Sequence, residues 1–193
     1  RHVIVSGNIS TEHSGGGLGI YYCSPLIENA RIENNRAVFV DGGGIQMYHA
    51  NPTLRNVLVA NNSAGGKGGG LFFDDADAMM VNMTVAGNTA AKGGGLNVSY
   101  SSAPTLQNCI VWSNGNNEIE FDTTWFGMSL YVNHSIVRGG SNGVVTHGKG
   151  PVTWISSSGD DPFLPARGIF RRPADRPAST RTSTSRGWRR PRT

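Results

Sequence analysis

The sequence is poor in cysteine and has no long apolar run, and these absences exclude several classes of protein. Its two cysteines, Cys23 and Cys109, stand in different repeats and at different repeat positions. We expect both to be small buried hydrophobic residues, and neither a disulfide nor a metal pair. No apolar run reaches the roughly 18 residues of a membrane-spanning helix. The five histidines show no metal-ligand spacing, so no zinc site is predicted.

Positive charge is scarce outside the C-terminal tail. The formal net charge is +4, but residues 166–193 hold nine Arg and one Asp and contribute +8. The other 165 residues carry 8 basic and 12 acidic groups, a balance of −4. The high isoelectric point therefore gives no support for a nucleic-acid partner, and we predict none.

Glycine, by contrast, is abundant and lies at fixed positions of an internal repeat. A Gly-Gly-Gly-apolar sequence starts four times, at spacings of 27, 26 and 25 residues. The starts are Gly15, Gly42, Gly68 and Gly93. Glycine adopts a positive φ freely, so we assign these residues to the tight corner of each repeat.

Two sets of asparagines repeat in phase with the glycines, at spacings of 27, 26 and 26 residues. The first set is Asn29, Asn56, Asn82 and Asn108, and the second is Asn35, Asn62, Asn88 and Asn114. Asparagine tolerates the left-handed conformation best among the other residues, and stacked Asn side chains can hydrogen-bond to one another. Both sets are therefore predicted to be structural ladders.

Each repeat contains three short apolar segments that alternate as strands do. One follows the glycines, one follows a proline and one follows the first asparagine. Their inward positions form three aliphatic stacks across the repeats: Leu18/Ile45/Leu71/Leu96, Ile27/Leu54/Met80/Leu106 and Ile32/Val59/Val85/Val111. Three consecutive glycines would cost a helix about 1 kcal/mol each, which counts against leucine-rich repeats with a helical side.

The repeat resembles the right-handed parallel β-helix of the pectin-lyase-like architecture. This resemblance implies an all-β, single-stranded solenoid of about five to six turns, or coils, with 25–27 residues in each. More narrowly, the chain is similar to bacterial secreted and surface β-helix proteins, including polymorphic outer-membrane proteins. A bacterial origin and a secreted or cell-surface location are what the resemblance implies. It covers about residues 2–165.

We expect two regions along the chain. Residues 1–165 form the β-helix, and the start without a Met or a signal peptide indicates a fragment whose N-terminal coils are missing. Residues 166–193, rich in Arg, Pro, Ser and Thr, are expected to be disordered. Relatives typically continue with Gly-Asp-Phe and, later, Pro-Cys-Ile-Asp-Ala. Codons for residues 168–170 can encode the first of these segments when read one base earlier, and codons for residues 177–181 can encode the second with the same shift. We therefore hypothesise that this tail is a frameshifted terminus.

Departures from the repeat are the candidates for function. Asp74, Asp75 and Asp77 follow an apolar segment, and an oxygen-rich loop of this kind can hold Ca²⁺. The alternative is a solvated turn. Tyr48, His49 and Asn51 lie one coil earlier and Tyr100 one coil later, and together they would suit a sugar ligand or an ordinary loop edge.

Further charged residues suggest pairs. Asp41 and Lys67 precede glycine triplets of adjacent coils, so we predict an exposed ion pair between them. Glu118, Glu120 and Asp122 alternate along one expected strand. They could supply the two carboxyl groups of a glycosidase, which must flank a cleft.

Two functions of different classes remain open. The first is a secreted or cell-surface β-helix that acts as a structural, adhesive or carbohydrate-binding module. The second is a polysaccharide lyase or glycoside hydrolase acting on acidic polysaccharide, with Ca²⁺ as the cofactor of a lyase. A third interpretation is that the fragment has no function of its own. The fold alone does not decide among them.

Overall fold

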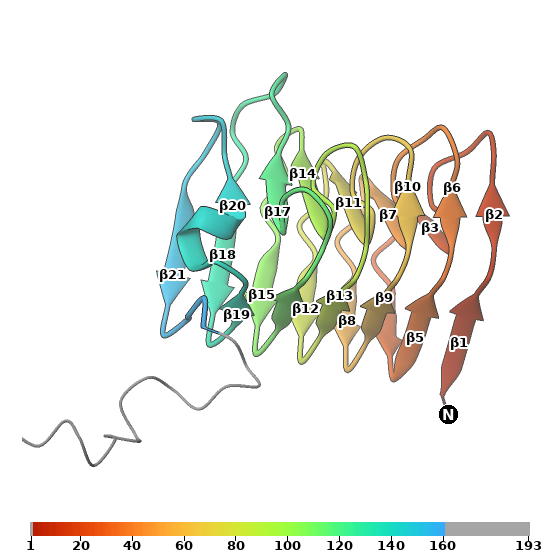
Figure 1. Cartoon of the computed structure of the whole chain (residues 1–193), viewed down its shortest axis with the longest axis horizontal. Helices are drawn as coiled ribbons and strands as arrows, with labels where there is room; N and C mark the ends of the chain where they lie inside the picture. Colours follow the sequence, from red (N-terminus) through yellow and green to blue (C-terminus); the bar gives the residue numbers. More distant parts are fainter. Residues whose placement is uncertain (1, 161–193) are drawn as a thin grey trace, which may run out of the picture. The chain divides into compact units, whose positions relative to one another are not determined.

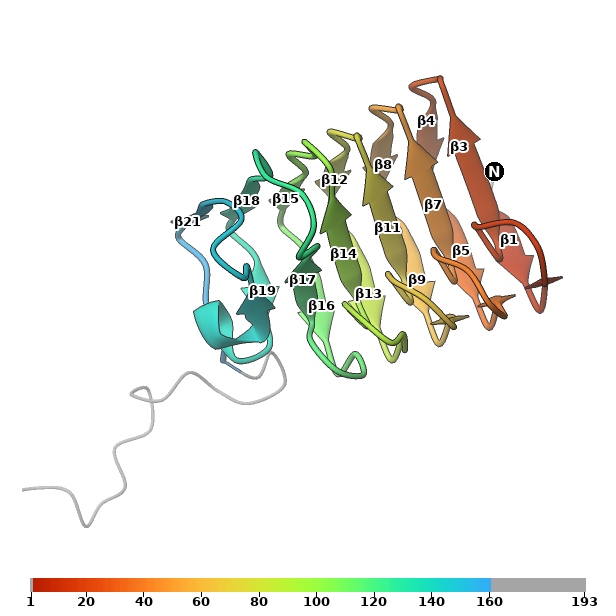
Figure 2. The same cartoon turned by 90° about the horizontal axis from the view of Figure 1, so that it is seen from above.

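The chain winds through about six coils of a parallel β-solenoid, with almost no helix. The structure is a computed structural model that describes residues 2–160. Figures 1 and 2 show the coils stacked one behind another, each adding one strand to each of the three long sides of the solenoid. All strand pairs are parallel and join neighbouring coils. The predicted all-β parallel β-helix is therefore confirmed.

Sheet C is the side that follows the glycines, and its six strands lie side by side in chain order. They are β3 (Leu18–Tyr21), β7 (Ile45–Tyr48), β11 (Leu71–Asp74), β14 (Leu96–Ser99), β17 (Ile119–Phe121) and β20 (Val144–Val145). The register joins Leu18, Ile45, Leu71, Leu96 and Ile119 as direct neighbours. Residues at one repeat position therefore form a row along the solenoid.

Sheets D and A are the other two long sides. Sheet D contains β4 (Leu26–Glu28), β8 (Thr53–Arg55), β12 (Met79–Val81), β15 (Thr105–Gln107), β18 (Leu130–Asn133) and β21 (Val152–Ile155). Sheet A contains β1 (Val3–Ser6), β5 (Ala30–Glu33), β9 (Leu58–Ala60), β13 (Thr84–Ala86), β16 (Ile110–Trp112) and β19 (Ile136–Val137).

A short fourth side, sheet B, was not predicted from the sequence. It pairs β2 (Ile9–Ser10), β6 (Arg36–Ala37) and β10 (Ser63–Ala64) just before the glycine corners. A single 3-10 helix, η1 (Gly140–Gly143), precedes β20 in the part of the chain that the structure describes.

The three predicted aliphatic stacks fill the interior. Ile32, Leu54, Leu71, Val59 and Leu106 are each at most 1% exposed. The two cysteines differ from each other: Cys109 is buried, as predicted, whereas Cys23 is exposed. The prediction for Cys23 is wrong because it lies in the turn after β3, outside the stacks.

The second asparagine set forms a buried hydrogen-bond ladder. Asn62 is 1% exposed and its oxygen accepts from the backbone N–H and the side-chain amide of Asn35, at 2.9 and 3.0 Å. Its own amide donates to the oxygen of Asn88 (3.0 Å) and to the carbonyl of Ile32 (2.9 Å). The same pattern continues through Asn114, whose amide donates to a carboxylate oxygen of Glu118 at 2.7 Å. Each buried amide is thus saturated by its neighbours along the stack.

The first asparagine set has a different role. Asn29, Asn56, Asn82 and Asn108 have φ between 52° and 54° and form the exposed turn between sheets D and A. Their side chains make single amide contacts between coils, 3.3 Å from Asn56 to Asn29 and 3.1 Å from Asn82 to Asn56. The backbone angle therefore dominates this ladder.

Only the first glycine of each triplet needs a positive φ. At Gly15, Gly42, Gly68 and Gly93 this angle is 85°, 70°, 63° and 58°. The third glycine is needed for space, because a Cβ at Gly44 would lie 2.6 Å from the carbonyl oxygen of Gly70 in the next coil. Stacking of backbone on backbone thus leaves no room for a side chain there.

The tail cannot be compared with this fold. Residues 161–193, which include the expected disordered and frameshifted tail, lie outside the described residues, so the proposed boundary at residue 165 stays a prediction.

No helix in the described range is long and apolar enough to span a membrane.

We predict that Asn62→Ala lowers the free energy of unfolding by about 3 kcal/mol. The substitution leaves several buried donors and acceptors of the inner ladder without partners. Asn56→Gly is the control, because it removes an exposed amide while keeping an easy positive φ, and it should cost less than about 1 kcal/mol. Urea unfolding followed by far-UV circular dichroism measures both. Equal losses for the two variants would contradict the assigned difference between the ladders.

Candidate functional site

The strands of sheet C end in two parallel rows of aromatic and acidic residues. The register places Tyr21, Tyr48, Asp74 and Ser99 side by side on successive coils, with their side chains on the outer face of the sheet. The next residues of these coils, Tyr22, His49, Asp75 and Tyr100, all have φ between 47° and 54°. We call these eight residues the sheet C ridge. Figure 2 shows the strands that carry it, β3, β7, β11 and β14, in line.

Aromatic rings dominate both ends of the sheet C ridge. Tyr22 stacks on the His49 ring, with ring centroids 5.3 Å apart and planes 16° apart. Tyr100 stacks on Trp125 at 4.1 Å and 22°. Tyr22, Tyr100 and Trp125 remain 72%, 37% and 40% exposed, so part of each side chain is accessible to a ligand. Sequence reasoning missed Trp125, because it lies in an irregular loop after β17 where no repeat position predicts its partner.

The carboxylates Asp74 and Asp75 occupy the middle of the sheet C ridge and behave differently. Asp75 lies 2.7 Å from Nδ1 of His49. The carboxylate of Asp74 forms no salt bridge or hydrogen bond with any described residue, although Asp74 is only partly exposed. Burial raises the pKa of Asp74 to about 6; the charge of His49 opposes this shift, and the charge of Asp41 adds to it. Asp74 thus stands out as a partly buried carboxylate without a direct partner among the described residues.

Lys67 pairs with Asp122, two coils further on, and not with Asp41 as predicted. Asp41 instead accepts a hydrogen bond from the backbone N–H of Lys67 at 2.6 Å. Burial alone would raise the pKa of Asp122, but the hydrogen bonds from Lys67 and from the Thr124 N–H hold it below its ordinary value. The prediction failed for two reasons. A lysine side chain spans more than one coil, and the Asp122 side chain is only 1% exposed, so its carboxylate requires a counter-ion.

The proposed glycosidase carboxylates are engaged by the protein. Glu120 accepts from the Gly93 N–H (2.9 Å) and the Asn117 amide (3.0 Å) and lies 3.1 Å from Nε2 of His147. Burial would raise the pKa of Glu120, but these partners lower it. Glu118 is 5% exposed and ends the inner asparagine ladder. These contacts give all three carboxylates of this strand structural partners.

One buried polar side chain beside the sheet C ridge lacks partners. Asn97 is fully buried, and neither its side-chain oxygen nor its nitrogen has a hydrogen-bond partner among the described residues. It lies on the outer face of β14, because Leu96 and Val98 on either side belong to the core. Unsatisfied buried amides are rare and call for a physical explanation.

The three aspartates predicted to bind Ca²⁺ do not converge. Asp77 accepts a hydrogen bond from the Ala103 N–H at 2.6 Å, and its own N–H donates to the side-chain oxygen of Asn51 at 2.8 Å. Asn51 and Asp77 therefore stabilise a turn, whereas Asp75 faces His49 and Asp74 faces the outer side of sheet C. No group of three or more His, Cys, Asp or Glu side chains suited to a metal ion occurs within residues 2–160. We therefore propose no calcium site.

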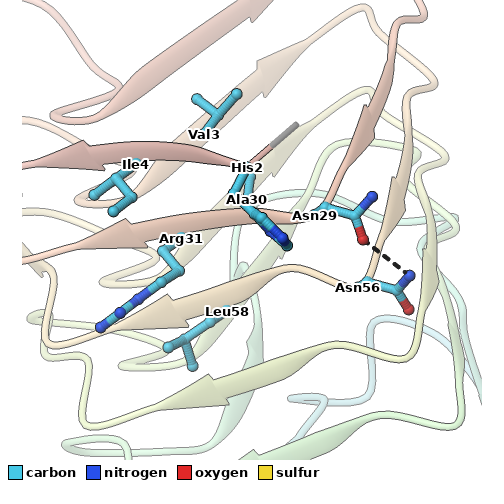
Figure 3. Close-up of a pocket in the computed structure, with 8 residues that line it drawn as sticks. All are labelled: His2, Val3, Ile4, Asn29, Ala30, Arg31, Asn56 and Leu58. Carbon is cyan, nitrogen blue, oxygen red and sulfur yellow. Dashed lines mark hydrogen bonds between the residues drawn. The ribbon is translucent and has the colours of Figure 1, made fainter.

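A separate hollow lies at the first coils, away from the sheet C ridge (Figure 3). It has a volume of about 660 Å³ and is lined by His2, Val3, Ile4, Asn29, Ala30, Arg31, Asn56 and Leu58. Figure 3 shows Asn29 and Asn56 joined by their ladder contact at one side of it. It brings together no set of acid, base and nucleophile, so it offers no chemistry beyond a surface groove.

Comparison with known proteins identifies the architecture only. The family model described as a right-handed beta helix region matches residues 1–158. No curated protein and no solved structure gives a significant match.

We predict that Lys67→Met lowers the free energy of unfolding by about 2 kcal/mol at neutral pH, because it leaves the Asp122 carboxylate buried without a counter-ion. The loss is smaller than for a fully buried pair, since the Lys67 side chain is 31% exposed. Lys92→Met, at the same position of the next coil, is the matched control and should change stability little. Chemical unfolding of the three proteins makes this comparison.

The pH dependence of that loss follows from the lowered pKa of Asp122. Its stabilisation is present above the unfolded-state pKa, about 3.9, and disappears as the pH falls through the lower folded-state pKa. The difference between the parent protein and Lys67→Met should therefore shrink on acidification to about pH 2. A difference that does not change with pH would contradict the ion pair.

Proposed function

The chain belongs to the right-handed β-helix family, and on that premise we propose that it is a secreted or cell-surface, non-catalytic module that binds carbohydrate along the sheet C ridge. The observation that carries this proposal is the set of aromatic side chains at the ends of β3, β7 and β14, with Asp74 and Asp75 on the intervening coil and the stacked Tyr100 and Trp125 at one end. Aromatic faces beside polar groups are a common way to bind a ligand with both apolar and hydroxyl surfaces.

The geometry of the coils suits an extended polymer. Neighbouring strands of a sheet lie about 4.8 Å apart, so equivalent side chains repeat at that interval along the sheet C ridge. The ridge runs over four coils, from β3 to β14, and Trp125 extends it to the coil of β17. A chain of sugar units lying along the solenoid would meet an aromatic ring, a carboxylate and a second aromatic ring in turn.

The scaffold adds rigidity. The strands that carry the sheet C ridge are hydrogen-bonded on both sides from β7 to β17, and the inner asparagine ladder runs in parallel with them. A site held on strands loses little conformational freedom when a ligand binds. This supports a binding or adhesive module that presents a preformed surface.

The contacts favour binding over catalysis by the carboxylates of β17. A general acid must hold a proton near neutral pH, whereas the pKa values of Glu120 and Asp122 are lowered by their protein partners. A glycosidase further needs two carboxyl groups that flank a cleft, and Lys67 and His147 already occupy these two. These contacts favour a binding module over a glycosidase.

We predict that the chain binds at least one polysaccharide from a panel of neutral, amino and acidic glycans, measured by affinity gel electrophoresis. The double variant Tyr100→Asn/Trp125→Ala should weaken this binding about tenfold or more, because two stacked rings are lost. Asn is chosen for position 100 because it tolerates the φ of 52°. Phe39→Ser, which removes an even more exposed ring on another edge, is the control and should leave binding unchanged.

Two results would contradict the proposal. One is a folded protein, with the far-UV spectrum of a β-solenoid, that binds no glycan of the panel. The other is equal binding by the double variant and the parent protein.

A further inference from the structure

The sheet C ridge places its two carboxylates beside aromatic rings. Asp74 lies directly between Tyr48 on β7 and Ser99 on β14. Asp75, on the following turn position, comes between His49 and Tyr100 along the row. An anion combined with the faces of neighbouring aromatic rings attracts cations, and ammonium groups in particular.

No described cation forms a direct ion pair with Asp74, because Lys67 pairs with Asp122 and His49 with Asp75. His49 and Lys67 lie near enough to lower the pKa of Asp74, but burial and the charges of Asp41 and Asp75 outweigh them and raise it to about 6. A carboxylate whose folded-state pKa is raised opposes folding above its unfolded-state pKa. Such a group is typical of a functional site.

Asn97 supplies an independent indication of a ligand on the same face. The register pairs Asn97 with Phe72 and, two residues later, Ser99 with Asp74. Asn97 is therefore a diagonal neighbour of Asp74. Its amide is fully buried and has both its donor and its acceptor unused. The Lys67 ammonium group, which contacts Asp122 and stands 6.0 Å from the centre of the Phe72 ring, lies on the same face. Unused hydrogen-bonding groups such as those of Asn97 call for a partner.

Lys67 also shows which chemistry the face accepts. Its ammonium group is held by Asp122 and stands 6.0 Å from the centre of the Phe72 ring, with Asp41 nearby. The protein thus already holds one ammonium group between carboxylates and an aromatic ring on this face. Asp74 offers a second carboxylate on this face, one that no described cation contacts directly.

We infer that the sheet C ridge recognises glycans that carry free amino groups, with an ammonium group of the glycan bound at Asp74 and neighbouring sugar rings against Tyr100 and Trp125. This inference rests on the proposed carbohydrate binding. An acidic polysaccharide would bring its own carboxylates against Asp74 and Asp75, where like charges repel. The sheet C ridge therefore favours amino glycans over neutral ones and neutral ones over acidic ones.

The test compares three oligosaccharides of matched length by isothermal titration calorimetry, at low salt and just above the Asp74 pKa of about 6. They are oligomers of glucosamine, of N-acetylglucosamine and of galacturonic acid. We expect the glucosamine oligomer to bind about tenfold more tightly than the acetylated one, because only the amine forms a charge-assisted hydrogen bond. Added salt should reduce that advantage, since salt screens partly exposed charges.

Two variants with the same change of charge locate the site. Asp74→Asn should reduce the affinity for the glucosamine oligomer about tenfold and leave the acetylated oligomer unaffected. Asp77→Asn is the matched control, because its side-chain oxygen can still accept the Ala103 N–H, and it should alter neither affinity. Removing an uncompensated charge should not unfold the protein, and circular dichroism of Asp74→Asn verifies this.

The outcomes separate this inference from the proposed function. Binding of none of the glycans contradicts carbohydrate binding itself. Equal or tighter binding of the acetylated or the acidic oligomer leaves carbohydrate binding standing and overturns the preference for amines. An unchanged affinity in Asp74→Asn also overturns the assigned site. Tetralysine that binds as tightly as the glucosamine oligomer would show a general cation site and overturn the role of the sugar.

Discussion

The parallel register between coils is the constraint on which the rest of this structure depends. Each residue lies directly beside its counterpart in the next coil, about 4.8 Å away. A side chain at one position is therefore surrounded on two sides by side chains of the same position. Apolar residues repeat as continuous stacks, buried amides saturate one another, and a corner without space for a Cβ requires glycine in every coil.

The same constraint organises the candidate site. Because register is kept from β3 to β17, a residue type placed at the end of one strand gains neighbours at a fixed interval on both sides. The ends of the sheet C strands are where the repeat no longer demands one residue type, and aromatic and acidic residues stand there. The scaffold thus separates positions that maintain the stack from positions that are free to vary in chemistry.

The periodicity of the sequence was sufficient to predict the fold. Glycine, asparagine and aliphatic residues at spacings of 25–27 each carry a backbone or core requirement, and the architecture is confirmed. The site was harder to predict, for two physical reasons. Consecutive residues of a strand point to opposite faces and a turn redirects them again, so Asp74, Asp75 and Asp77 do not converge. Long side chains also reach past the nearest coil, which is why Lys67 has Asp122 as its partner.

The inner asparagine ladder gives the solenoid a direction. Each side-chain amide from Asn35 to Asn114 donates to its C-terminal neighbour in the ladder and accepts from its N-terminal one, so these hydrogen bonds between coils all run in one direction. A coil with asparagine at this position presents an acceptor to the coil before it and a donor to the coil after it. A duplicated coil would therefore fit between any two existing ones. Glu118 accepts but cannot donate, and so it closes the series at one end. Gene duplication could thus lengthen such a protein one coil at a time, with each new copy entering in a single orientation.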